Sequence, residues 1–235
     1  MSASPNPDAV ELPESIELPK SIELIVFDLD GTLLASLPDI AASANAVREK
    51  HGKEPRTFDQ IAAAIGRGAA ALVEQVLDDV IAEIGNFDTV FHQFREFYAI
   101  ESVRNPQLYP GTIELLERAR EHSHLAIFTN KPLAITDAVV DRLEIRSYFG
   151  EVFAPENAGG RKPDPTGLHR LIERFDATPA TTVMVGDSIN DFAVGRNAET
   201  FTVGLRAGYY KPGEPDPHVW LDDVVALDRW LTDLR

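Results

Sequence analysis

Two aspartates, Asp28 and Asp30, stand one residue apart directly after the apolar segment 22–27. Apart from Glu23 this segment is hydrophobic and predicts a strand, so both carboxylates fall where the chain leaves the strand's carboxyl end. Ligands bind at this edge of an open α/β sheet. Two carboxylates ionised at neutral pH repel one another unless a cation or a shared proton lies between them. The pair therefore indicates a charged functional site, although an ordinary Asp/Gly turn would also contain these residues.

Further polar residues follow two later segments, 125–128 and 181–185, which we expect to be strands. One more polar residue of interest lies in the loop over 159–165. They are Thr129, Asn130, Lys131, Asp187, Ser188, Asp191 and, in the loop, Lys162. The carboxyl ends of parallel strands lie along one edge of a sheet, where ligands bind. We therefore expect these side chains to converge with Asp28 and Asp30.

The expected site combines carboxylates with hydrogen-bond donors. Carboxylate and carbonyl oxygens are the ligands that Mg²⁺ prefers, and Thr, Asn and Lys side chains donate to phosphate oxygens. Phosphoryl transfer needs both, because cations neutralise the charge on the transferred oxygens while a nucleophile attacks in line. The residue types thus indicate Mg²⁺-dependent phosphoryl transfer.

Strand and helix patterns alternate through the second half of the chain. We expect strands at 125–128, 152–153, 181–185 and 201–204, and helices at 112–120 (capped by Thr112), 132–143, 165–175 and 223–234, with another that ends near 198. Such alternation predicts an α/β fold built on a doubly wound parallel sheet with right-handed crossovers.

The stretch between the first two strands contains only helical patterns. We expect four helices: at 38–50, at 57–65, one after residue 68 with i, i+4 apolar positions from Leu72 to Ile84, and one with an aromatic stripe from Phe87 to Tyr98. We interpret the stripe as core rather than as a cofactor site. The pattern predicts an all-α domain over 36–104, inserted into a core domain formed by 22–35 and 105–235.

Residues 1–21 differ from the rest of the chain, since they contain four prolines and most of a repeated hexad, 11–16 and 17–22. Proline in each copy prevents a regular helix, and two copies are too few to stack as a solenoid. We expect a flexible leader.

The composition is that of an ordinary globular protein, with 44% hydrophobic and 26% charged residues among 235. A net charge of −16 argues against a nucleic-acid partner and requires local cations for any anionic substrate. The absence of cysteine excludes disulfides and thiol nucleophiles. No apolar run approaches the roughly 20 residues that span a bilayer, and no signal peptide is evident. We expect a cytoplasmic monomer or homodimer that binds a small phosphorylated metabolite and no membrane.

Four motifs, in this order, resemble those of the haloacid dehalogenase superfamily. They are DLDGT at 28–32, Thr129-Asn130, Lys162-Pro163 and GDSIND at 186–191. The resemblance covers about residues 22–235. It implies a Rossmann-like core, with the inserted helices forming a cap domain.

The resemblance also implies a role for each matching residue. Asp28 would be the nucleophile that forms an aspartyl-phosphate, and Asp30 the general acid and base. The implied Mg²⁺ ligands are the carboxylates of Asp28 and Asp187 and the backbone carbonyl of Asp30. Thr129, Asn130 (with its backbone) and Lys162 would hold the phosphate, while Asp191 and Ser188 would support the metal or orient Lys162.

A finer match is to phosphoglycolate phosphatase-like enzymes, which implies 2-phosphoglycolate as substrate. The matching segments are LPDIA at 37–41, IGRG at 65–68 with Leu72-Val73, and TNKP at 129–132; Ala35-Ser36 departs from the family's usual Asp-Ser. Arg67 could pair with a substrate carboxylate or be a solvated loop residue. Lys131 could contact substrate or simply lie beside the site.

Two other functions remain open at this stage. A sugar phosphomutase of the same superfamily would share every core motif. A non-catalytic accessory protein of a biosynthetic pathway could keep the fold, but it would be expected to lose a core acid, and none is lost. A dehalogenase is disfavoured because it would not need Asp30 and Asp187.

Overall fold

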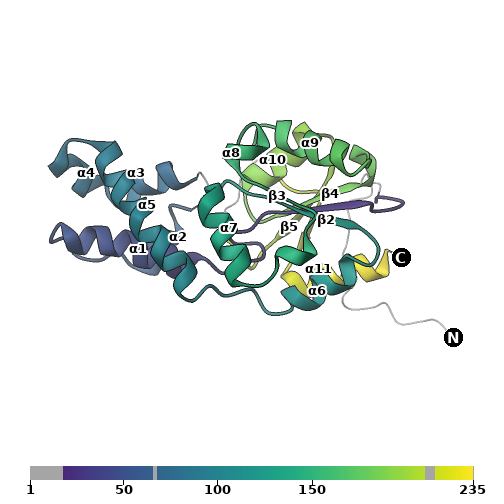
Figure 1. Cartoon of the computed structure of the whole chain (residues 1–235), viewed down its shortest axis with the longest axis horizontal. Coiled ribbons are helices and arrows are strands. Elements are labelled where there is room, and N and C mark those ends of the chain that lie inside the picture. Colours follow the sequence, from purple (N-terminus) through teal and green to yellow (C-terminus); the bar gives the residue numbers. More distant parts are fainter. Residues whose placement is uncertain (1–17, 66–67, 210–214, 235) are drawn as a thin grey trace.

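A six-stranded parallel sheet forms the centre of the molecule, with strands in the order β3-β2-β1-β4-β5-β6. The strands are β1 (Leu24–Phe27), β2 (His124–Phe128), β3 (Glu151–Phe153), β4 (Thr182–Gly186), β5 (Phe201–Leu205) and β6 (Val219–Leu221). The computed structural model describes residues 18–65, 68–209 and 215–234, so most of the predicted leader lies outside the described residues. Helices cover both faces of the sheet (Figure 1), and the predicted doubly wound α/β fold is confirmed.

The strand order reverses at the centre of the sheet, because the chain runs from β1 outward through β2 to β3 and then returns to β4 on the other side. Phe27 at the end of β1 is level with Ile127 of β2 and Val185 of β4. The residues that follow these three strands therefore leave the sheet at nearly the same height. Ligands bind at such a reversal point, outside the carboxyl ends of the strands.

The sheet is buried on both faces, as expected for parallel strands. Ile25 and Phe27 belong to a core cluster shared with α6, α7 and α11. Leu24 and Val26 point the opposite way, into a cluster shared with α9 and α10. These helices are α6 (Thr112–Ala119), α7 (Leu133–Arg142), α9 (Thr166–Arg174), α10 (Ile189–Asn197) and α11 (Val224–Asp233).

Five helices lie together beyond the carboxyl edge of the sheet, on the left of Figure 1. They are α1 (Leu37–Lys50), α2 (Phe58–Ala62), α3 (Ala69–Val76), α4 (Asp78–Ile84) and α5 (Phe87–Arg104). We call them the helical layer. The long helices α1 and α5 pack against each other within it.

The prediction of four helices in this layer was wrong, because the expected third helix is interrupted at Leu77. The buried Arg48 of α1 donates to the Val76 carbonyl at 2.8 Å and to the Asp79 carboxylate at 2.7 Å. The Val80 amide, which would bond to Val76 in a continuous helix, donates to the Asp79 carboxylate instead. A contact from another helix therefore overrides the local apolar periodicity.

Smaller differences concern helix ends and short elements. Gly111, with φ of 87°, is the residue before α6, and Thr112 lies inside the helix without capping it, contrary to the prediction. The helix α8 (Pro155–Ala158) and the strand β6 were not predicted. The helix α8 spans little more than one turn, which is too short to show a helical periodicity.

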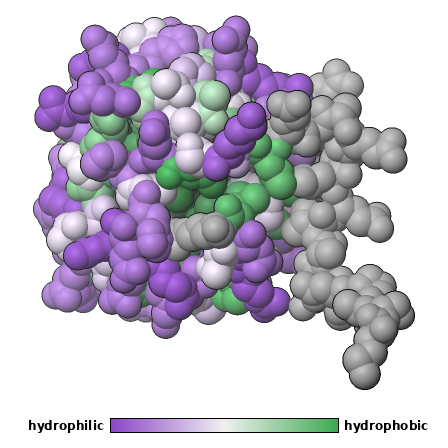
Figure 2. All heavy atoms as spheres, turned by 90° about the vertical axis from the view of Figure 1, so that its right-hand side faces the viewer, coloured by the Kyte–Doolittle hydropathy of each residue, from purple (hydrophilic) through white to green (hydrophobic). Residues whose placement is uncertain are grey.

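The surface is largely hydrophilic on the face that Figure 2 presents, with hydrophobic side chains gathered near its middle. A strongly charged surface agrees with the high net charge of the chain. Among the described residues, no helix combines the length and the hydrophobicity that crossing a bilayer would require.

Candidate active site

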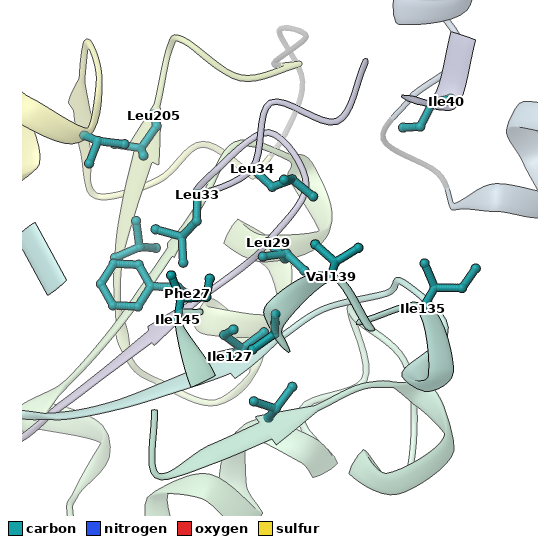
Figure 3. Close-up of a cluster of buried hydrophobic side chains, with 14 of the residues drawn as sticks. Phe27, Leu29, Leu33, Leu34, Ile40, Ile127, Ile135, Val139, Ile145 and Leu205 are labelled. Atoms are coloured by element: carbon teal, nitrogen blue, oxygen red, sulfur yellow. The ribbon is translucent and has the colours of Figure 1, made fainter. Parts of the chain in front are cut away.

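The turn after β1 is anchored by its apolar residues. Leu29, between the two aspartates, is fully buried and belongs with Val139 of α7 to one cluster of buried hydrophobic side chains (Figure 3). The Leu34 amide donates to the Leu29 carbonyl at 2.8 Å, and the Gly31 amide donates to the Leu34 carbonyl at 2.9 Å. This closed turn fixes Asp28 and Asp30 at the edge of the sheet.

Lys162 joins two of the predicted acids. Its ammonium lies 2.7 Å from Asp28 Oδ1 and 2.5 Å from Asp191 Oδ1, and all three side chains are buried. The other Asp191 oxygen accepts from the amide of Ser188 at 3.0 Å and from its hydroxyl at 2.6 Å. Ser188 and Asp191 thus cap the start of α10 and fix the Asp191 carboxylate from both sides.

Asp187 completes a compact group of carboxylates. Its two oxygens accept from the Tyr209 amide at 2.6 Å and from the Thr32 hydroxyl at 3.3 Å. One oxygen from each of Asp28, Asp187 and Asp191 lies within 4.8 Å of the others. Asp28 follows β1, Asp187 follows β4 and Asp191 lies in the first turn of α10, so the cluster forms where the order of the strands reverses.

The carboxylates outnumber the single ammonium of Lys162 that is paired with them. Burial, reinforced by Asp191, raises the pKa of Asp28 to about 7 against the opposing effect of Lys162. Burial and the neighbouring Asp191 and Asp28 also hold the pKa of Asp187 well above its usual range. Such crowding is relieved by a hard cation with oxygen ligands, so the donor set fits Mg²⁺.

The cluster contains the two carboxylates predicted as metal ligands, Asp28 and Asp187, together with Asp191, which was predicted to support the metal or orient Lys162. The Asp30 side chain, for which no metal contact was predicted, lies outside the cluster. Asp30 Oδ1 instead lies 2.8 Å from the ammonium of Lys131. A role for the Asp30 backbone carbonyl as a metal ligand stays a prediction.

Asn130 contacts the Lys162 loop rather than presenting its side chain as a free donor. Its Oδ1 accepts from the Lys162 amide at 2.9 Å, and its Nδ2 donates to the Lys162 carbonyl at 3.0 Å. This reciprocal pair holds the loop against the end of β2. Thr129 is buried and accepts from the Lys131 amide at 3.2 Å; its predicted contact with phosphate stays a prediction.

Tyr98 was missed as a site residue, because the aromatic stripe of α5 was interpreted as core alone. The side chain is 5% exposed, its hydroxyl accepts a hydrogen bond from the Lys131 ammonium, and that ammonium lies 4.4 Å from the ring centroid. A tyrosine at the end of a phenylalanine stripe was the available signal, since a buried hydroxyl needs a partner.

Tyr209 is a second site residue that the sequence analysis did not identify. Besides donating its amide to Asp187, it accepts from the Leu37 amide at 2.6 Å through its hydroxyl, which lies 3.3 Å from the Ser36 hydroxyl. It therefore connects the acid cluster to the start of α1.

A pocket opens above these residues, between the sheet edge and the helical layer. Its polar floor includes Asp28, Asp30, Thr129, Lys131, Lys162 and Asp187, and its helical wall is mainly apolar, with Ile40, Ile65, Ala69, Leu72 and Phe94. The site can thus hold an anion at the floor and enclose the attached group. Arg67, the predicted substrate contact, lies outside the described residues.

Gly31 is expected to be indispensable to this geometry. Its φ is +85°, and a Cβ there would lie 2.3 Å from Asp187 Oδ2. Gly31→Ala should lower activity at least about tenfold by displacing Asp187, and it should destabilise the fold.

Gly85→Ala is the matched control, because the φ of Gly85 is also positive, at +72°, and no atom lies within 4 Å of a Cβ added there. The control should cost about 1–2 kcal/mol in urea unfolding and leave activity intact; equal behaviour of the two variants would contradict the clash.

Comparison with known proteins places these features in context. A family model described as haloacid dehalogenase-like hydrolase matches residues 22–199. The chain is 34% identical to a phosphoglycolate phosphatase of Photobacterium profundum over 86% of this chain and 93% of that protein. It is 30% identical to an N-acetylmuramic acid 6-phosphate phosphatase of Pseudomonas putida, over 86% and 90%. A crystal structure of a predicted phosphoglycolate phosphatase from Haemophilus somnus has a TM-score of 0.79 and 30% identity, covering 89% and 97%.

Proposed function

Because the chain belongs to the haloacid dehalogenase-like hydrolases, we propose that it is a Mg²⁺-dependent phosphatase that hydrolyses a small phosphomonoester. One observation carries the proposal: Asp28 lies against Lys162 in a buried acid cluster at the floor of the pocket between the sheet edge and the helical layer. A carboxylate nucleophile beside a fixed cation suits attack on a phosphoryl group. We further propose that residues 36–104 form a cap domain over a core of 22–35 and 105–235.

In the proposed mechanism, Asp28 attacks phosphorus and forms an aspartyl-phosphate, while Asp30 gives a proton to the departing alkoxide. Asp30 then takes a proton from the water that attacks phosphorus and frees Asp28. Lys162 and the Thr129 hydroxyl bind the phosphoryl oxygens. Asp28 and Asp187, joined by Asp191, would hold Mg²⁺, which when bound supplies further positive charge beside those oxygens.

The best substrate candidate is 2-phosphoglycolate. The names of several relatives at 31–34% identity support it, and the pocket has room beside its polar floor for the group attached to the phosphate. One relative, at 30% identity, is named as a phosphatase of N-acetylmuramic acid 6-phosphate, which is a larger ester. We therefore state the proposal for small phosphomonoesters as a class, with 2-phosphoglycolate as the first candidate. Arg67 and Lys131 were the predicted contacts for the group attached to the phosphate.

The proposal is tested with a panel of phosphomonoesters that includes 2-phosphoglycolate and sugar phosphates. We expect release of inorganic phosphate in the presence of Mg²⁺, a fall of at least about tenfold after chelation, and recovery when Mg²⁺ is restored. Phosphate release from no ester would refute the proposal. Isomerisation of a sugar phosphate without net phosphate release would identify a mutase instead.

A further inference from the structure

From the contacts around Asp30, we infer that Tyr98 and Lys131 form a positioning pair that holds this carboxylate in place for proton transfer. The inference rests on the proposed function, in which Asp30 is the general acid and base. Asp30 and Lys131 belong to the sheet edge, whereas Tyr98 comes from α5 in the helical layer. Tyr98, a side chain from the helical layer, would thus help to hold the Asp30 carboxylate at the sheet edge in its position for proton transfer.

The contacts form a chain from the helical layer to the acid. The Lys131 side chain is fully buried, and its ammonium donates to Asp30 Oδ1 at 2.8 Å and to the Tyr98 hydroxyl. The same ammonium lies 4.4 Å from the centroid of the Tyr98 ring, at the hydroxyl end of the side chain. Two hydrogen bonds therefore fix the ammonium, and the ammonium fixes one oxygen of the carboxylate.

This arrangement favours positioning over the predicted substrate contact for Lys131. A buried ammonium is costly unless it is paired and hydrogen-bonded, and Asp30 and Tyr98 already meet both needs. Asp30 is 21% exposed in its side chain and lines the pocket, so its second oxygen can carry the transferred proton. A proton donor must lie within hydrogen-bond reach of the leaving oxygen, and a held carboxylate meets this condition without reorientation.

The pair also connects the helical layer to the chemistry. Tyr98 stacks on Phe94 of the same helix, with ring centroids 5.5 Å apart, and α5 packs against α7 of the core. The Lys131 backbone is held in turn by Thr129 at the end of β2. The pair is therefore complete only when α5 covers the sheet edge.

The dependence of kcat/KM on the leaving group distinguishes a variant that misplaces the general acid from one that disturbs the whole site. Departure of p-nitrophenolate needs little protonation, whereas departure of an alkoxide needs a proton from the acid. In Lys131→Met, kcat/KM for an alkyl phosphate should fall about 10- to 100-fold, while kcat/KM for p-nitrophenyl phosphate should change less than about threefold. Tyr98→Phe keeps the ring and removes the hydroxyl, so it should lower only the alkyl value, by about five- to tenfold.

Two control variants make the same chemical changes away from the pocket. Lys53→Met removes a lysine paired with Glu83, and Tyr148→Phe removes a hydroxyl beside Glu117; both should leave both kcat/KM values unchanged. Thermal unfolding establishes that each variant is folded. If Lys131→Met does not fold, the more conservative Tyr98→Phe decides.

Three results would overturn the inference. They are an equal loss on both substrates, no loss on either in folded variants, and a change in KM alone for the alkyl substrate, which would indicate a substrate contact. The alkyl substrate is the ester of the panel that the wild-type protein hydrolyses fastest, and wild-type protein that hydrolyses no ester of the panel would refute the proposed function itself. Wild-type activity with an unselective loss in the variants would refute only the positioning role.

Discussion

Asp28→Asn is expected to abolish turnover, with kcat for phosphate release reduced at least about 10⁴-fold. The amide carries no charge and cannot attack phosphorus, although it occupies the same volume beside Lys162. Asp28 is 7% exposed and lies 2.7 Å from that ammonium, so no neighbouring carboxylate can take its place without moving the cluster. Steady-state phosphate release and rapid-quench trapping of the phosphorylated protein would both measure the loss.

Stability distinguishes this loss from misfolding. The buried Asp28 is one of three clustered carboxylates, and Asp191 contributes to raising its pKa. Asparagine removes that repulsion, and Lys162 keeps its ion pair with Asp191, so the melting temperature without Mg²⁺ should not fall. Asp137→Asn, at a surface ion pair with Arg146, is the matched control and should retain full activity. Activity of Asp28→Asn above about one hundredth of wild type would argue against Asp28 as the nucleophile.

The arrangement of the sheet could be predicted because its determinants are local. Each of the longer strands is a short apolar run, and alternation with helices requires a parallel sheet with its polar strand ends on one edge. That reasoning correctly brought Asp28, Asp187 and Lys162 together. It could not find the break at Leu77, since we attribute the break to the hydrogen bond that Arg48 donates to the Val76 carbonyl, 28 residues later in the chain.

The parts of the site that were missed depend on distant partners. Tyr98 meets Lys131 across 33 residues, and Tyr209 meets Leu37 across 172. The sequence marks Tyr98 only as a tyrosine at the end of a phenylalanine stripe, and it does not indicate which residue either tyrosine contacts. The role of Asn130 was obscured differently: its residue type suits a phosphate donor, but its side chain is used by the Lys162 backbone. The residue types were therefore enough to locate the site. The contacts that each side chain makes depend on the packing of the folded chain.

Lys162→Met should lower both stability and activity. Burial alone would lower the pKa of the Lys162 ammonium, but Asp191 and Asp28 outweigh it and raise the pKa, so the cation is firmly held. Removing one partner from a buried ion pair costs about 3–5 kcal/mol, and loss of a cation at the phosphoryl oxygens should lower kcat about 10²- to 10³-fold. Urea unfolding and phosphate release would measure the two effects.

Mg²⁺ provides the decisive comparison for this variant. The remaining carboxylates of Asp28, Asp187 and Asp191 would lack their ammonium, so added Mg²⁺ should restore more stability to Lys162→Met than it adds to wild type. Lys53→Met, which breaks an exposed pair with Glu83, should change neither stability nor its response to Mg²⁺ appreciably. An unfolding free energy of Lys162→Met equal to that of wild type in chelator would mean that the cluster is not held by this cation. In that case the carboxylates of the cluster would have to be protonated and neutral in the folded protein, instead of being paired with the Lys162 ammonium.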